Sequence, residues 1–112
     1  MELTLEQLGD IAVVKLPVDH LDASNCEEFE TPLLGVIDQH SKVILDLSRV
    51  EFIDSSGVGV LLFCVRKSDN QGGQISICNP TESVAMAFDL VRMHRLCAVT
   101  GSPEESAAGF CA

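Results

Sequence analysis

The sequence predicts an α/β fold with a mixed, mostly parallel sheet of four to five strands and about four helices. Short apolar runs rich in β-branched residues alternate along the chain with longer segments whose apolar residues recur at helical spacing. Strands that alternate with helices are joined by right-handed crossovers, and such crossovers make a sheet mostly parallel. The chain of 112 residues suits a single domain, 1–112, around one core.

The predicted elements begin with a hairpin. Polar residues alternate with Leu3 and Leu5, and Gly9-Asp10 favours a turn, so the first strand should be an antiparallel edge. In order, the elements are strands at 3–8 and 11–16, a helix at 21–40, a strand at 43–47, a short apolar step at 50–53, a helix at 56–71, a strand at 74–79, a helix at 81–93, a strand at 96–100 and a helix at 102–110.

The first helix has a clear start, because Asp22 or Ser24 is expected to cap it. Pro32 should bend or weaken it, since proline lacks the N–H that a helix interior uses. Its inward face is formed by residues at helical spacing, namely Phe29, Leu33, Val36 and Ile37. The run at 43–47 is short, apolar and β-branched, as a strand buried on both faces should be.

The later helices are predicted from apolar stripes and from their first residues. The second helix carries a stripe of Val58, Leu61, Leu62 and Val65, widened by Val60, Phe63 and Cys64. The third gathers Val84, Ala87, Phe88 and Val91 on one face. Thr81 is expected to cap the third helix, and Ser102 the fourth, with Pro103 at its first position. Ala107 and Phe110 should pack inward.

Composition and charge favour a protein partner. The formal net charge is −10 at pH 7, and the pI is near 4.4. Such a chain repels phosphate backbones and anionic lipid, so we expect no nucleic acid and no membrane as partner. The longest apolar run, 58–65, is far shorter than the ~20 residues that span a bilayer, and no signal peptide opens the chain. A cytoplasmic location is therefore expected.

The cysteines are odd in number and lack metal-ligand spacing. They are Cys26, Cys64, Cys78, Cys97 and Cys111. Cys64 and Cys78 lie within apolar runs, where cysteine behaves as a small hydrophobic residue. We expect free thiols in a reducing compartment and no metal site. Cys111, close to the C-terminus, is a candidate for exposure and for redox sensing.

The stretch FIDSSGVGVLLFCVRK, residues 52–67, places a polar turn between two apolar segments. In open α/β sheets, sites form beyond the carboxyl ends of strands, where helices begin. Ser55 or Ser56 is expected to cap the helix through its hydroxyl, and capping is the commoner role of such serines. Gly57 and Gly59 either flatten a surface for a partner or pack against a neighbouring strand.

Catalysis is not supported by any recognisable motif. A nucleophilic serine needs a base within hydrogen-bonding reach and an oxyanion hole. His20 is the one histidine that the predicted order places near Ser55. The sequence has no nucleophile elbow, phosphate-binding loop, zinc-binding helix or dinucleotide fingerprint. We expect neither an enzyme nor a cofactor, and a small hydrolase using Ser55 and His20 is kept as an alternative.

The segment VILDLSRVEFIDSSGVGVLLFCVRKSDNQGGQISICNP, residues 43–80, resembles the signature region of STAS domains. The shared pattern is a strand ending in Asp-Leu, a connector, an apolar pair and Asp-Ser-Ser-Gly, then a helix, Gly-Gly and another strand. LDASN at 21–25 and AFDLVRMHRLCAV at 87–99 resemble the family more loosely, and LPVDH at 16–20 departs from its usual pattern. The chain is most similar to the stand-alone anti-sigma factor antagonists of bacteria.

This resemblance implies a STAS-type domain in a partner-switching cycle. The unmodified antagonist binds an anti-sigma factor, usually a serine kinase of the histidine-kinase-like ATPase fold, and so releases the sigma factor. The kinase phosphorylates the serine after the motif aspartate, here Ser55, and a separate phosphatase reverses the modification. Asp22 and Asp54 match the two motif acids that flank the site. The implied partner-binding residues are Asp22, Asp54, Ser55, Ser56, Gly57, Val58 and Gly59.

The residues alone leave two questions open. Ser55 and Ser56 are equal candidates for the phosphate, and only the resemblance favours Ser55. The same fold also suits a subunit of another assembly, such as a lipid-transport complex or a signalling scaffold, without kinase regulation. A phosphate would add about −1.5 to −2 charges at a helix start, which a solvated site tolerates and a buried interface beside Asp54 does not.

Overall fold

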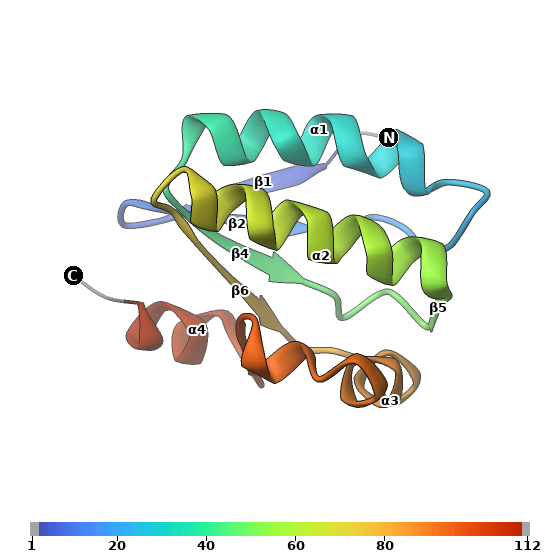
Figure 1. Ribbon diagram of the computed structural model, residues 1–112. Helices are drawn as coiled ribbons and strands as arrows, with labels where there is room; N and C mark the ends of the chain where they lie inside the picture. Colours follow the sequence, from blue (N-terminus) through green and yellow to red (C-terminus); the bar gives the residue numbers. More distant parts are fainter. Residues whose placement is uncertain (1–2, 111–112) are drawn as a thin grey trace.

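The computed structural model describes residues 3–110 and has a five-stranded mixed sheet at its centre (Figure 1). The strands lie in the order β1 (Thr4–Leu8), β2 (Ile11–Lys15), β4 (Lys42–Asp46), β6 (Gln74–Cys78) and β7 (Ala98–Thr100). Neighbouring strands are parallel except β1 and β2, which form an antiparallel hairpin. The predicted mixed sheet, with an antiparallel first strand at its edge, is confirmed.

The described residues form four α-helices, as predicted. They are α1 (Cys26–Gln39), α2 (Ser55–Asn70), α3 (Glu82–Val91) and α4 (Pro103–Gly109), and a 3-10 turn at Met93–Arg95 follows α3. Figure 1 shows α1 and α2 side by side over one face of the sheet, whereas α4 packs against its opposite face. Within residues 3–110, no helix combines the length and the apolar character needed to cross a membrane.

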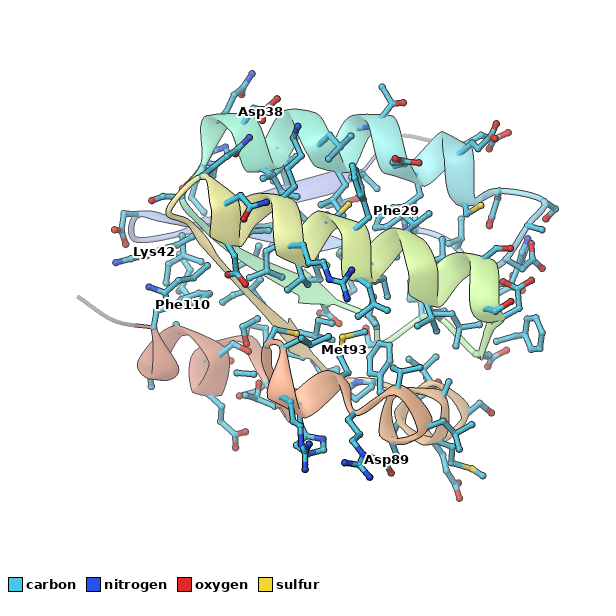
Figure 2. The ribbon with its side chains drawn as sticks, in the orientation of Figure 1. Phe29, Asp38, Lys42, Asp89, Met93 and Phe110 are labelled. Atoms are coloured by element: carbon cyan, nitrogen blue, oxygen red, sulfur yellow. The ribbon has the colours of Figure 1, made fainter. Side chains whose placement is uncertain are left out.

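The core is mostly aliphatic and lies in two layers. The larger layer fills the space between one face of the sheet and the helices α1, α2 and α3. Phe29 is fully buried there, and Figure 2 shows it on the side of α1 that faces α2. Each such side chain contributes roughly 1.5–3 kcal/mol relative to an exposed one. The smaller layer is covered by Ala107 of α4 and by Phe110, which confirms their predicted inward packing.

Two side chains assigned to the inner faces of helices lie at the surface instead. Phe63 on α2 is 49% exposed, and Val91 on α3 is 41% exposed. A helix buries one stripe of its circumference, and Leu61 and Val65 already occupy that stripe on α2. Val91 is the last residue of α3, where the helix leaves the core. The predictions for Phe63 and Val91 were therefore wrong.

The start of α1 differs from the prediction. Its N-cap is Asn25, not Asp22 or Ser24. Asp22 and Ser24 bond to each other instead, because the Asp22 carboxylate accepts both the N–H and the hydroxyl of Ser24. The helix continues through Pro32 to Gln39, so the proline does not end it.

The other helix starts agree with the prediction in two cases out of three. The cap of α2 is Asp54, and Ser55 is already the first helical residue, so the predicted capping by Ser55 or Ser56 was wrong. Thr81 is the N-cap of α3 by position, although its hydroxyl donates to a neighbouring loop carbonyl. Ser102 caps α4 through its side chain, as predicted.

A second, two-stranded parallel sheet was not predicted. It pairs β3 (His20–Leu21) with β5 (Phe52–Ile53). The sequence pattern placed Leu21 inside the first helix and gave 50–53 only as a short apolar step. A two-residue strand shows no alternation, so periodicity gives no signal for it. This small sheet positions the candidate site.

The cysteines of the described residues are free thiols, as predicted: Cys26, Cys64, Cys78 and Cys97. Burial raises the pKa of Cys64 and of Cys78 to about 12, and the pKa of Cys97 to about 11. These three thiols stay protonated near neutral pH, and a protonated thiol is a poor nucleophile. Cys111 lies outside the described residues.

Candidate functional site

The small β3–β5 sheet holds together the two loops that lead into α1 and α2. The carbonyl of Asp19 accepts the N–H groups of Glu51 and Phe52 at 2.8 and 3.3 Å. The carbonyl of Leu21 accepts the Asp54 N–H at 3.3 Å. The loop after β3 and the loop after β5 therefore lie next to each other, although about thirty residues separate them in the sequence.

Asp54 joins these two loops through its carboxylate. One oxygen, Oδ1, accepts the Gly57 N–H at 3.0 Å and so caps α2. The other, Oδ2, accepts the Ala23 N–H of the neighbouring loop at 3.3 Å. A carboxylate also suits the positive end of the helix dipole. Asp54 is thus a structural part of the site, and its charge lies at the start of α2.

Ser55 is the first residue of α2 and is exposed, whereas Ser56 is half-buried. The backbone N–H groups of a helix's first turn have no partners within the helix. Asp54 satisfies the N–H of Gly57 but leaves those of the two serines free of helical acceptors. A hydroxyl at Ser55 is therefore open to solvent at a position where added negative charge meets N–H groups and the helix dipole.

Asp22 lies in the loop that contacts Asp54. The hydrogen bonds from Ser24 lower the pKa of Asp22, so its carboxyl is charged at neutral pH. Asn25 fixes the loop from the other side, because its side chain accepts the Asp22 N–H at 3.0 Å and donates to the His20 carbonyl at 2.9 Å. The two motif acids named in the sequence thus belong to adjoining loops, and Asp54 is the one that bonds the first turn of α2.

Gly57 and Gly59 have different roles. Gly57 is buried, and a Cβ at this position would lie 2.2 Å from the Leu21 carbonyl oxygen and 2.8 Å from Ile53 Cγ1. The missing side chain lets the first turn of α2 contact the β3–β5 sheet directly. Gly59 is exposed, with open space beside its Cα. Close packing therefore explains Gly57, and Gly59 contributes to the surface.

An apolar groove runs from Ser55 between α2 and α3, and we call it the α2–α3 groove. Its volume is about 430 Å³, and it is lined by Ile53, Asp54, Ser55, Val58, Gly59, Leu62, Ala87, Leu90 and Val91. On α3, Leu90 is 86% exposed and Met86 is 63% exposed. Exposed apolar surface with a polar rim is typical of protein-docking sites.

The structure divides the predicted partner-binding residues into two groups. Those that line the α2–α3 groove are Asp54, Ser55, Val58 and Gly59. Asp22, Ser56 and Gly57 lie outside it, and buried Gly57 offers no surface to a partner. The α3 side of the groove was missed. The sequence signal for an apolar surface on α3 was the spacing of Met86 and Leu90. They lie four residues apart and on the side of α3 that faces away from the core.

His20 is paired with its neighbour rather than with Ser55. Its Nδ1 lies 2.8 Å from Asp19 Oδ1. This hydrogen bond raises the pKa of His20 above its ordinary value of 6.5 and lowers the pKa of Asp19. A serine nucleophile needs a base that is hydrogen-bonded to its hydroxyl. In the structure, the His20 ring is bonded to Asp19 and not to the Ser55 hydroxyl.

We expect His20 to titrate above pH 6.5 in the folded protein, and Asp19→Asn to lower that midpoint. Because the folded-state pKa is raised, the pair stabilises the fold below the unfolded pKa and loses this contribution as the pH rises through the folded pKa. Both side chains are largely exposed, so the effect on stability is small. NMR of the imidazole proton from about pH 5 to about pH 9 measures the midpoint. An unchanged midpoint in Asp19→Asn would contradict the pairing.

The fold and the serine turn together define one class of protein. The chain belongs to the STAS domain family, whose model matches residues 2–107. Among its relatives is a Bordetella bronchiseptica protein provisionally named as the anti-sigma factor antagonist BtrV. The two are 26% identical over 111 residues, which is 98% of this chain and 95% of the relative.

Solved structures share the fold at lower identity. A protein from Thermotoga maritima, provisionally named as an anti-sigma factor antagonist, has a TM-score of 0.86 and 22% identity over 95% of this chain and 92% of that one. The phosphorylated form of the Bacillus cell fate determinant SpoIIAA has a TM-score of 0.71 and 24% identity over 96% of this chain and 97% of that one. The STAS-type fold predicted from the sequence is confirmed.

Proposed function

We propose that this chain is an anti-sigma factor antagonist that binds an anti-sigma factor serine kinase, frees the sigma factor, and is released when Ser55 is phosphorylated. The observation that carries the proposal is an exposed Ser55 at the first position of α2, on the rim of the apolar α2–α3 groove. The names of the relatives support it, and so does the solved phosphorylated form of SpoIIAA. In this account the chain is a cytoplasmic binding module and a kinase substrate, without catalytic activity of its own.

Ser55 is the better phosphate acceptor of the two serines. A kinase must reach the hydroxyl, and Ser55 is exposed while Ser56 is half-buried. A phosphate on Ser55 would meet the free N–H groups of the first turn, a contribution of roughly 0.3–1 kcal/mol. Repulsion from the capping carboxylate of Asp54 opposes this gain. Because the group is solvated, the fold is expected to tolerate the modification, and a phosphatase can reach it.

The proposed partner places apolar side chains in the α2–α3 groove and a basic group beside the Asp54 carboxylate on its rim. Leu90 supplies exposed apolar surface in the groove, Met86 extends that surface on α3 outside the lining, and Asp54 supplies charge. A docked partner would cover Ser55, because Ser55 lines the groove. Unmodified serine fits such a contact, whereas a dianion at the same place must be desolvated next to a carboxylate.

Replacing Leu90 with alanine is expected to weaken binding of the captured partner about 10- to 100-fold without destabilising the fold. Leu90 is 86% exposed in the free protein, so its removal costs folding little. Burying a leucine in an interface contributes roughly 1.5–3 kcal/mol, which gives this range of affinity. Isothermal titration calorimetry measures it. Leu8→Ala on β1, which removes another exposed leucine, is the control and should bind like the native chain.

The proposal is tested by capture from a lysate of the source cell, with native chain and Ser55→Asp as parallel baits. We expect the native bait to retain an ATP-binding regulator of sigma factors and the Ser55→Asp bait to lose it. Retention of the same regulator by both baits would contradict the charge switch. Capture of a partner without an ATP-binding fold, indifferent to the charge at residue 55, would instead favour a STAS subunit of another assembly.

A further inference from the structure

A cavity of about 640 Å³ lies at the end of α2 remote from Ser55, where α1 and α2 both end. Its lining includes Asp38, His40 and Ser41 from the end of α1 and the turn after it, and Ser68, Gln71 and Gly73 from the end of α2. Figure 2 shows Asp38 on the last part of α1, near the turn that leads into β4. The cavity shares no lining residue with the α2–α3 groove, and the Asp-Ser-Ser-Gly turn lies at the opposite end of α2.

The lining of this cavity includes a carboxylate and the ends of two helices. Two helices end here with the negative ends of their dipoles. At the end of α2, the carbonyls of Lys67, Ser68 and Asp69 already accept N–H groups of the turn that follows. At the end of α1 the Val36 carbonyl accepts the His40 N–H at 2.9 Å, and the carbonyls after it have no helical donor beyond them. The carboxylate of Asp38 is bonded by the neutral side-chain amide of Gln71 at 3.0 Å, so its charge is not compensated by that contact. These features favour a cation that carries N–H donors.

Ser68 supplies an independent observation. The residue is 1% exposed, and its hydroxyl oxygen has no hydrogen-bond partner in the described structure. Buried hydroxyls are nearly always hydrogen-bonded, so this one calls for a partner that is not part of the chain. Ser68 lines the cavity together with Gly73, and a Cβ on Gly73 would lie 2.8 Å from both the Ser68 hydroxyl oxygen and the Ser41 carbonyl oxygen. A side chain at residue 73 would therefore crowd the Ser68 hydroxyl, whereas the Ser41 carbonyl already accepts the Gln74 N–H at 2.7 Å.

We propose that this cavity binds a small organic cation with several N–H donors, of the amine or guanidinium class. Asp38 takes the charge, and the Ser68 hydroxyl accepts an N–H at the floor of the cavity. A divalent metal fits less well, because the described residues contain no group of three or more His, Cys, Asp or Glu placed to hold one. An anion is disfavoured by Asp38 and by both helix ends.

The test is an NMR titration of the full chain with agmatine, which carries both an ammonium and a guanidinium group. We expect saturable shift changes confined to 37–41 and to Ser68, Gln71 and Gly73. Asp38→Asn should weaken binding about tenfold, because it removes the charge from the assisted hydrogen bond. Ser68→Ala should weaken it several-fold while leaving the melting temperature unchanged or higher, since the native hydroxyl is unpaired.

Two controls separate a site from general attraction to an acidic protein. Asp89→Asn removes one exposed carboxylate on α3, outside the cavity, and should leave the affinity unchanged. Tetramethylammonium, a cation without N–H donors, should not produce the same shifts. Shifts spread over the acidic surface, an equal response to tetramethylammonium, or an unaltered affinity in Asp38→Asn would overturn the proposal. A blocked arginine tripeptide distinguishes an arginine side chain of another protein from a free small cation as the ligand. If the tripeptide binds as tightly as agmatine, the site takes a protein side chain. If it binds more weakly, the site takes a free cation.

Discussion

Replacing Ser55 with aspartate is expected to weaken binding to the anti-sigma partner by about a hundredfold or more, whereas Ser55→Ala should bind within a few-fold of the native chain. A hundredfold loss corresponds to about 2.7 kcal/mol. Leaving a buried charge without a partner in an interface costs several kcal/mol, and here the added carboxylate lies beside Asp54. Removing the hydroxyl alone introduces no charge.

The same measurement needs a control for the added charge itself. Asn70→Asp introduces the same carboxylate at the other end of α2, away from the groove, and should keep nearly native affinity. Thermal melts of all three variants should be close to one another, because residues 55 and 70 are both exposed. If Ser55→Asp binds as tightly as Ser55→Ala, the charge switch at this position is wrong. If it binds weakly but is also unfolded, the result concerns the fold and not the interface.

Gly57→Ala is expected to destabilise the fold by roughly 1–3 kcal/mol, the range of overpacking in a closely packed site. The new Cβ would lie 2.2 Å from the backbone oxygen of Leu21, so either α2 or the β3–β5 sheet must move. Gly59→Ala, two residues along, meets open space and should stabilise the helix by up to ~1 kcal/mol.

Urea unfolding of the two variants tests this pair directly. The unfolding midpoint should fall in Gly57→Ala and stay level or rise in Gly59→Ala. Equal midpoints would show that the first turn of α2 does not pack on the β3–β5 sheet as described. Because Gly57 supports the turn that presents Ser55, we also expect Gly57→Ala to bind the partner less well even at temperatures where it is folded.

The main elements of the fold could be predicted from the sequence because they rest on periodicity. The stripe through Phe29, Leu33 and Ile37 gave α1, and the apolar runs gave β4 and β6. The β3–β5 sheet could not be found this way, since its pairing is set by tertiary contacts between loops about thirty residues apart. The cap of α2 was missed for a related reason. Good capping residues occur at three successive positions, Asp54, Ser55 and Ser56. The hydrogen bond between Asp54 and the Ala23 N–H favours Asp54 as the N-cap of α2.

The candidate site was predicted only in part. The position of Ser55 at a helix start followed from strand–helix alternation, but its place on the rim of a groove did not. That groove depends on how α3 packs against α2, and a single sequence gives no angle between helices. The exposed pair Met86 and Leu90 could have indicated an apolar surface on α3, although not its contact with Ser55.

The central claim is that Ser55 is a kinase substrate, and intact-mass spectrometry after incubation with the captured regulator and ATP tests it most directly. The account predicts a species heavier by about 80 Da, the mass of one phosphoryl group, for the native chain and for Ser56→Ala. The same species should be absent in Ser55→Ala. A mass increase that persists in Ser55→Ala and disappears in Ser56→Ala, or no increase with any regulator that the native chain captures, would contradict it.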